Sequence, residues 1–282
     1  MIKLLQWSVI FIIFTFSSGL HAQSLTKEGV YDAIKEMPSF SIYKDNYFIT
    51  GIPLNKDIND NTSDLKYQIS FKHLLIRHNM PWDTYLFAAY TQKAFWNFYK
   101  LSSPFQDINF NPAIGLGKPF FDKEGKINGI ASFMVNHNSN GRDSISSRNW
   151  NSVNLKYLTR LNPRTFLSVE AWAPFKYKKN NPDLFDYIGF TEVKVSYDLK
   201  PDTYIFEVML KKGARWDWKG SVRSRLFYNP FKSKNQYFML EWFAGYAENL
   251  LNYKHFTSML RIGYVIKTDE FDFLRPKQND SR

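Results

Sequence analysis

The feature that most restricts the fold of this chain is an alternation of apolar and polar side chains that recurs in runs of roughly ten residues. One run places Leu65, Tyr67, Ile69 and Phe71 between Lys66, Gln68, Ser70 and Lys72. Successive side chains of a strand point to opposite faces, so each run predicts a strand with one apolar face. About twelve runs begin near residues 46, 65, 83, 108, 127, 150, 165, 189, 203, 220, 236 and 255, and breaker residues such as proline separate them. The pattern predicts an all-β chain of antiparallel strands.

Alternation alone does not say which face of the sheet turns inward. A water-soluble sandwich buries its apolar faces, whereas an outer-membrane barrel turns them to lipid and keeps its charges inside. The chain is 18% aromatic, with 17 Tyr, 8 Trp and 26 Phe, which suits the aromatic girdles of a membrane barrel. We therefore predict a transmembrane antiparallel β-barrel of about 12 strands, occupying residues 23–282 as one domain, with a short helical turn within residues 25–37.

Residues 1–22 have the pattern of a secretory signal peptide. Lys3 supplies a positive charge, a mostly apolar stretch follows from Leu4 to Phe16, and small residues lead to a predicted cleavage after Ala22. The apolar stretch is shorter than the ~20 residues that a spanning helix needs, and no later segment reaches that length. The sequence predicts export, with strands rather than helices crossing the bacterial outer membrane.

Charge and cysteine content exclude several classes of protein. The formal net charge is +11, but the basic residues are scattered and no nucleic-acid-binding motif accompanies them, so we expect no nucleic-acid partner. An anionic lipid surface suits this charge better, and Lys93 is expected at a solvated strand end or against lipid phosphates. The chain has no Cys, which excludes disulfides and thiolate metal sites.

Three residues with catalytic chemistry fall at the ends of two apolar stripes. Alternation continues the stripe of residues 129–135 to His137 and Ser139, and a second stripe begins at Asn151. A serine nucleophile needs a base to take its proton, and the base needs a third group to orient it. On spacing alone, the commoner explanation is that His137 and Ser139 end a strand while Asn151 caps a loop.

A resemblance to a known family favours the catalytic interpretation. The motif His137-x-Ser-Asn-Gly-Arg142 followed by Ser147-Arg148-x-Trp150-Asn151 resembles the active-site signature of the outer-membrane phospholipase A family. Further similarities, between about residues 65 and 264, are Tyr90-Thr-Gln-Lys93, Trp96, Ser102-Ser-Pro-Phe105, Asn181-Pro-Asp183 and Tyr187-Ile-Gly189.

The resemblance implies a 12-stranded barrel that hydrolyses acyl esters of membrane phospholipids, with phospholipase A1, A2 and lysophospholipase activity. It implies Ser139 as nucleophile, His137 as general base and Asn151 as the group that orients the imidazole. It further implies a Ca²⁺ cofactor and an active homodimer with Gln92 at its contact; an interior strand position for Gln92 stays open. Its calcium-linked positions match the Arg142 carbonyl, Ser147, Asp183 and, from a second subunit, Ser102.

The predicted orientation of the triad gives a separate argument for a lipase. If the apolar stripes face lipid, His137, Ser139 and Asn151 face outward, where a substrate must arrive laterally as a membrane lipid does. A non-enzymatic porin or structural barrel is the main alternative and predicts an open polar lumen. A different outer-membrane acyl hydrolase, such as a lipid A deacylase, and a soluble hydrolase are further alternatives.

Overall fold

The computed structural model describes residues 25–268, 274 and 275. The predicted signal peptide, residues 1–22, lies outside the described residues. Among those that are described, no helix has the length and apolar character needed to span a membrane.

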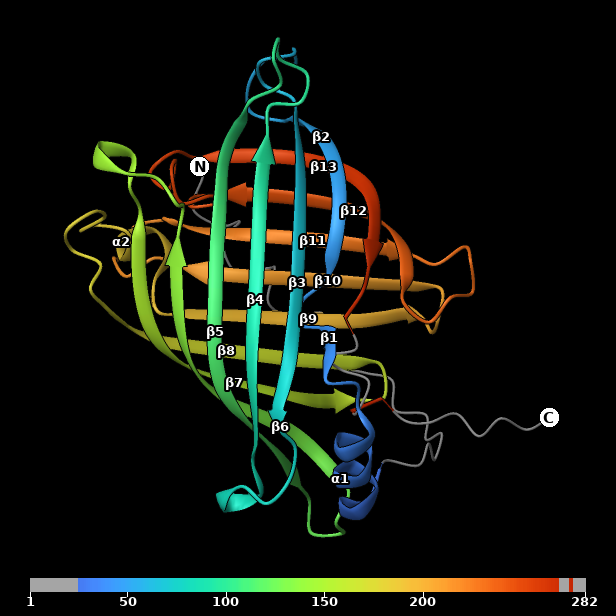
Figure 1. The fold of residues 1–282 in the computed structure, drawn as a ribbon. Coiled ribbons are helices and arrows are strands. Elements are labelled where there is room, and N and C mark those ends of the chain that lie inside the picture. The colour runs from blue at the N-terminus through green and yellow to red at the C-terminus, as the bar shows by residue number, and fades with distance from the viewer. Residues whose placement is uncertain (1–24, 269–273, 276–282) are drawn as a thin grey trace, which may run out of the picture.

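Twelve antiparallel strands close into a barrel (Figure 1). Each pairs with its neighbours in the sequence, and β13 returns to β2, with Val265 opposite Tyr47, so that these twelve strands form a closed ring. The strands are β2 (Asn46–Pro53), β3 (Asp64–Ile76), β4 (Tyr85–Trp96), β5 (Phe105–Phe121), β6 (Ile127–Ser139), β7 (Asn149–Asn162), β8 (Thr165–Phe175), β9 (Thr191–Lys200), β10 (Tyr204–Lys212), β11 (Gly220–Tyr228), β12 (Gln236–Gly245) and β13 (Thr257–Ile266). The predicted 12-stranded barrel is confirmed, and the predicted strand starts agree with the observed ones to within three residues.

Short elements complete the chain. Strand β1 (Phe40–Ile42) pairs with β3 beyond the end of β2, and two 3₁₀ turns lie at η1 (Pro81–Asp83) and η2 (Ser144–Ser146). Helix α2 (Phe185–Ile188) lies in the loop between β8 and β9. The predicted helical turn is a full helix, α1 (Lys27–Glu36). Thr26 is its N-cap residue, because the Thr26 hydroxyl accepts a hydrogen bond from the Gly29 amide.

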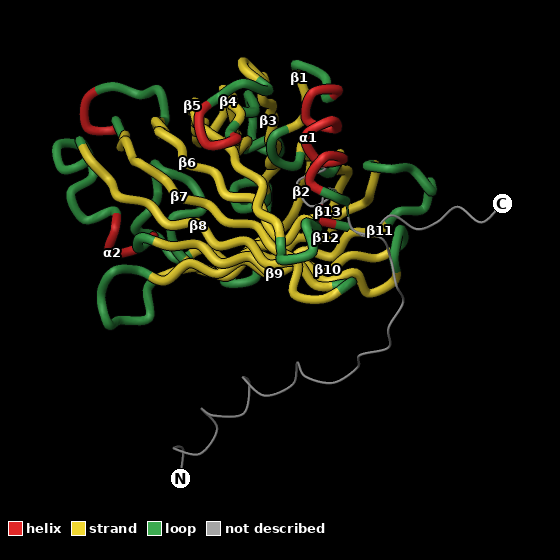
Figure 2. The backbone as a smooth tube through the Cα atoms, turned by 90° about the horizontal axis from the view of Figure 1, so that it is seen from below, coloured by secondary structure: helices red, strands yellow, loops and turns green. Residues whose placement is uncertain are grey.

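Helix α1 lies beside β1 in both views (Figures 1 and 2) and packs at the end of the barrel where β6 begins, opposite the end of β6 that carries Ser139. Val30 and Ile34, four residues apart, share one helix face and pack against Ile130, Leu158 and Phe166. These five side chains are at most 8% exposed, and they form an apolar layer at this end of the barrel.

The two faces of the barrel wall are inverted relative to a water-soluble protein. Apolar side chains such as Phe133, Leu155 and Ile262 point outward and are 52%, 57% and 59% exposed. Charged side chains such as Glu241 and Arg261 point inward and are at most 1% exposed. The apolar faces therefore turn to the surroundings, as the barrel interpretation predicts.

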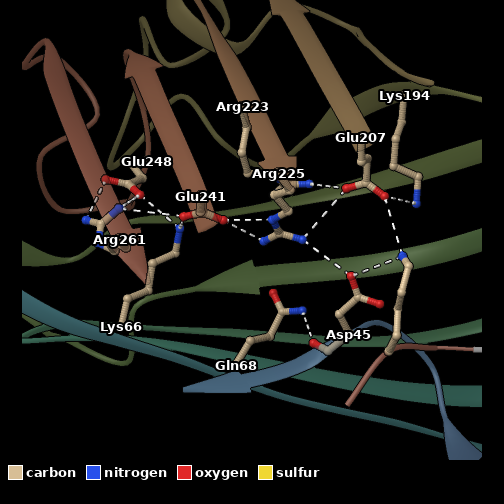
Figure 3. Close-up of polar contacts among 11 residues, drawn as sticks. Asp45, Lys66, Gln68, Lys194, Glu207, Arg223, Arg225, Glu241, Glu248 and Arg261 are labelled. Atoms are coloured by element: carbon tan, nitrogen blue, oxygen red, sulfur yellow. Dashed lines mark hydrogen bonds and ion pairs between the residues drawn. The ribbon is translucent and has the colours of Figure 1, made fainter. Parts of the chain in front are cut away.

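Ion pairs between distant strands connect the interior charges (Figure 3). Lys66 Nζ lies 2.7 Å from Glu241 Oε1 and 2.9 Å from Glu248 Oε1. Arg261 binds Asp64 with two hydrogen bonds of 2.7 and 2.8 Å. Glycine is required opposite Arg261, because a Cβ at Gly51 would lie only 2.5 Å from the Arg261 Cγ. The interior is thus crossed by paired side chains rather than open.

Candidate active site

The ladder between β6 and β7 places His137 directly opposite Asn151. The His137 side chain is exposed on the outer face, and its Nδ1 lies 2.8 Å from Asn151 Oδ1. An amide oxygen can only accept, so Nδ1 carries the proton and donates it to this bond. Nε2 is therefore left as the free base of the imidazole, ready to take a proton.

Ser139 is the last residue of β6 and lies on the same face as His137, two residues further along the strand. Its partners in the ladder are Phe110 on β5 and Asn149 on β7. Two residues of strand correspond to roughly 7 Å, and among the described residues the Ser139 hydroxyl makes no hydrogen bond to the imidazole. Catalytic hydrogen bonds are often long without substrate and shorten when it binds, so this spacing is compatible with a Ser–His pair.

Asn140 holds the loop that connects β6 and β7. Its side chain is 4% exposed, donates to the Ser146 carbonyl at 2.9 Å and accepts from the Arg148 amide at 2.9 Å. The next residue, Gly141, has φ +63°, a conformation that glycine adopts without strain. Asn140 was not predicted as a functional residue; the Asn-Gly dipeptide, a strong turn signal, is the pattern that points to it.

Two of the predicted calcium-linked oxygens lie in this same loop. The Ser147 hydroxyl accepts a hydrogen bond of 3.1 Å from Asn180 Nδ2, and the Arg142 carbonyl accepts none from the described part of the chain. Ser102 is exposed in a different loop, the one between β4 and β5, and has φ +63°. Neutral carbonyl and hydroxyl oxygens are ligands that Ca²⁺ accepts, so the chemistry of Arg142 and Ser147 fits this ion.

Asp183, the fourth predicted position, is already bound to protein groups. The Tyr253 hydroxyl donates to one carboxylate oxygen, and Lys254 Nζ lies 2.7 Å from the other. Burial raises the pKa of Asp183, but the hydrogen bonds from Lys254 and Tyr253 outweigh it and hold the pKa below its usual value. The same contact raises the pKa of Tyr253, after burial as the larger cause. Asp183 thus joins the loop after β8 to the loop before β13.

Known proteins with similar sequences identify the family. A model of the family described as phospholipase A1 matches residues 32–266. The chain belongs to the phospholipase A1 family. It is 26% identical over 287 residues to the phospholipase A1 of Escherichia coli (strain K12), covering 90% of this chain and 95% of that protein. It is 28% identical over 217 residues to the phospholipase A1 of Salmonella typhimurium, covering 74% and 71%.

Solved structures of phospholipase A share this fold. The outer membrane phospholipase dimer of Salmonella typhi with bound calcium superposes with a TM-score of 0.74 and 23% identity, covering 86% of this chain and 99% of that one. The Escherichia coli outer membrane phospholipase A superposes with a TM-score of 0.71 and 24% identity, covering 82% and 99%. An active-site mutant of the Escherichia coli protein with asparagine replaced by alanine gives 0.72.

Family membership and the barrel together confirm the coarse predictions. The predicted family and the predicted enzyme class, a phospholipase acting as an ester hydrolase, are confirmed. The fold and the family make this chain an outer-membrane protein.

Proposed function

We propose that this chain hydrolyses the acyl esters of glycerophospholipids with a Ser139-His137-Asn151 triad on the outer wall of the barrel. The observation that carries the proposal is the His137–Asn151 hydrogen bond of 2.8 Å on the exposed face. Because this bond fixes the proton on Nδ1, Nε2 is free to take the proton of the Ser139 hydroxyl.

The reaction then follows from these roles. The Ser139 oxygen attacks the ester carbonyl carbon as His137 Nε2 takes its proton, and a tetrahedral intermediate forms. Collapse breaks the ester C–O bond, and His137 returns the proton to the leaving alkoxide of the lysolipid. Water then releases the fatty acid from Ser139 with His137 again as base. Asn151 orients the ring; as a neutral amide it cannot offset the imidazolium charge as Asp does.

The outer wall supplies a path for the acyl chain. Phe133 and Val135 precede His137 on its face of β6, and Leu155 lies opposite Phe133 on β7. These side chains are 52%, 44% and 57% exposed, so an apolar stripe leads from the middle of the wall to the triad. A lipid in the surrounding membrane can lie along this stripe while its ester reaches Ser139.

We propose calcium as the cofactor, bound by the Arg142 carbonyl and the Ser147 hydroxyl, with Ser102 from a second copy of the chain. When bound, Ca²⁺ would supply positive charge beside the developing oxyanion, with the Gly141 amide as a second candidate donor. Asp183 would act indirectly, since it holds the loop from which Asn180 binds the Ser147 hydroxyl. The solved Salmonella typhi relative is a dimer with bound calcium, which supports this proposal.

We further propose an active homodimer and export through a signal peptide at residues 1–22. Gln92 is half-buried on the outer wall, between Ile69 and Phe110 in the ladder, where its amide accepts a hydrogen bond of 3.0 Å from the Tyr90 hydroxyl. A polar side chain in an otherwise apolar zone suits a contact between two barrels better than a contact with lipid. The ion pairs that cross the interior argue against the porin alternative.

The test of the function is fatty-acid release from phospholipid by the detergent-refolded protein, with Ca²⁺ and with chelator. We expect calcium-dependent release that Ser139→Ala and His137→Ala each abolish, while Ser144→Ala, in the same loop, keeps it. Substantial turnover by either triad variant would refute the assigned roles. If a chelator does not reduce the release of fatty acid, calcium is not the cofactor.

A further inference from the structure

A cavity of about 230 Å³ lies inside the barrel, behind the wall that carries the candidate triad. The loop between β12 and β13 crosses this end of the barrel, and its amides at Leu250 and Leu251 bind the side chains of Asn109 and Asp107 on β5. Asn138 and Trp150, which line the cavity, face each other in the ladder next to His137 and Asn151. The cavity and the triad thus lie on opposite sides of the same two strands.

The lining of the cavity contains more cations than carboxylates. The basic residues are Lys44, Lys93, Lys156, Lys194, Lys211, Arg223 and Arg225, and the acidic ones are Asp45, Glu170, Glu192, Glu207 and Glu248. The carboxylates are already engaged: Glu192, for example, lies 3.1 Å from Lys211. Glu248 is bound by Lys66 and Arg261, and Arg225 is bound by Glu241; none of these three partners lines the cavity. Without Glu248 and Arg225, the remaining lining cations still outnumber the remaining carboxylates. The cavity therefore has a surplus of positive charge.

Lys93 contributes most directly to this surplus. In the described part of the chain its ammonium has neither a hydrogen bond nor an ion pair, and its charged neighbours are three cations, Lys66, Lys211 and Arg223, and one carboxylate, Glu248. The expectation that Lys93 lies at a solvated rim or against lipid is wrong, because its position in β4 turns it into the barrel. A buried cation without a counterion is unfavourable, so this position favours an anion.

Unpartnered hydrogen-bond donors face the same cavity. Trp150 is 8% exposed. Within the residues that the structure describes, its Nε1, the Asn138 amide nitrogen and Arg223 Nε have no hydrogen-bond partner. Among the described side chains that line the cavity, each buried polar atom without a hydrogen-bond partner is a donor rather than an acceptor. Water molecules can accept from single donors, but they cannot offset the positive charge.

We propose that this cavity binds a small oxyanion of the phosphate class, through Lys93 and Arg223 with donors from Trp150 and Asn138. Such an ion carries several acceptor oxygens and one or two negative charges, which match the donors and the surplus charge. The volume is several times the ~30 Å³ that one water occupies in the liquid, so the ion fits. A free phosphate and the phosphate of a lipid-derived head group share this chemistry.

The test measures the thermal unfolding midpoint of the refolded full chain as inorganic phosphate is added, with chloride keeping the ionic strength constant and no calcium present. We expect a saturable rise in the wild type, and binding at least tenfold weaker in Lys93→Met and Arg223→Met. In chloride alone, Lys93→Met should unfold no earlier than wild type, because it removes an unpaired cation. Lys179→Met, on the exposed loop after β8, is the matched control and should behave as wild type.

Phosphorus NMR of the wild type with phosphate gives a second, direct measurement if a variant fails to fold. Titration with glycerol 3-phosphate distinguishes the sources: tighter binding than phosphate identifies a head group, and weaker binding identifies the free ion. The proposal is overturned if phosphate raises the midpoint of Lys93→Met as much as that of wild type. It is equally overturned if phosphate does no more than chloride and leaves the NMR signal unchanged.

Discussion

Replacing Glu241 by Gln should destabilise the barrel more than any single change at its surface. Glu241 is fully buried and its carboxylate accepts from Lys66 Nζ at 2.7 Å and from Arg225 Nε at 2.8 Å (Figure 3). Arg261 Nη1 lies 3.7 Å away. Gln keeps the shape of the side chain but removes its charge, so three buried cations lose a shared counterion.

The contacts set the size of the expected loss. Removing one partner of a buried ion pair costs roughly 3–5 kcal/mol, because the remaining charge stays desolvated. Lys66 keeps Glu248 at 2.9 Å, Arg225 keeps Asp45 at 3.5 Å and Arg261 keeps Asp64 at 2.7 Å, so each cation retains a carboxylate. We therefore expect the lower end of the range, about 3 kcal/mol, a change of roughly 100-fold in the unfolding equilibrium.

The assay is reversible urea unfolding in lipid vesicles, followed by tryptophan fluorescence. Glu124→Gln is the control, because Glu124 pairs with Lys126 on the exposed surface, where solvent screens the pair, so this variant should unfold close to wild type. Adding Lys66→Met to Glu241→Gln should recover part of the loss, since it removes one excess cation. Equal stabilities of the Glu241→Gln and Glu124→Gln variants would refute the view that the interior pairs stabilise the barrel.

Two further predictions concern the outer wall and its loops. Asn151→Ala should lower kcat roughly two- to tenfold with little change in KM, because it removes one orienting hydrogen bond worth ~0.5–1.5 kcal/mol. The measurement is a phospholipid hydrolysis assay, and an unchanged kcat would contradict the orienting role of Asn151. The lowered pKa of Asp183 means that its contacts stabilise the loop above the ordinary carboxyl pKa and are lost as pH falls below about 4. In hydrogen exchange, the protection of the amides of residues 181–189 should therefore drop on acidification in wild type. In Asp183→Asn this protection should be low and nearly independent of pH. The same pH dependence in both proteins would contradict the role given to the Asp183 carboxylate.

The strands and the candidate triad could be predicted because both depend on local alternation. A period of two assigns every side chain to a face, so the sequence alone placed His137 and Asn151 at the ends of apolar stripes. The structure then put them opposite each other in the ladder. Breaker residues bounded the strands, and the start of β5, predicted near 108 and found at Phe105, shows the usual limit at strand ends.

The interior contacts could not be predicted, because they join residues that only barrel closure brings together. Lys66 and Glu241 are 175 residues apart, and nothing near either one indicates the other. Asp183 illustrates the same limit in the loops. Its local Asn-Pro-Asp sequence predicts a turn, whereas its partners Tyr253 and Lys254 come from the far end of the chain.

The geometry of β6 and β7 explains how one pair of strands can serve two different environments. Because side chains alternate, His137 and Asn151 face outward while their neighbours Asn138 and Trp150 face the interior cavity. The His137–Asn151 contact is fixed by the ladder rather than by a loop, so it depends on the register of two long strands. Contacts between β5 and β6, such as the hydrogen bond of 2.9 Å from Asn111 Nδ2 to the His137 carbonyl, hold that register. A substitution that removes the Asn111 side-chain amide should therefore lower the rate of hydrolysis, although Asn111 is not one of the residues that would contact the lipid. The reason is that it loosens the strand that positions the imidazole.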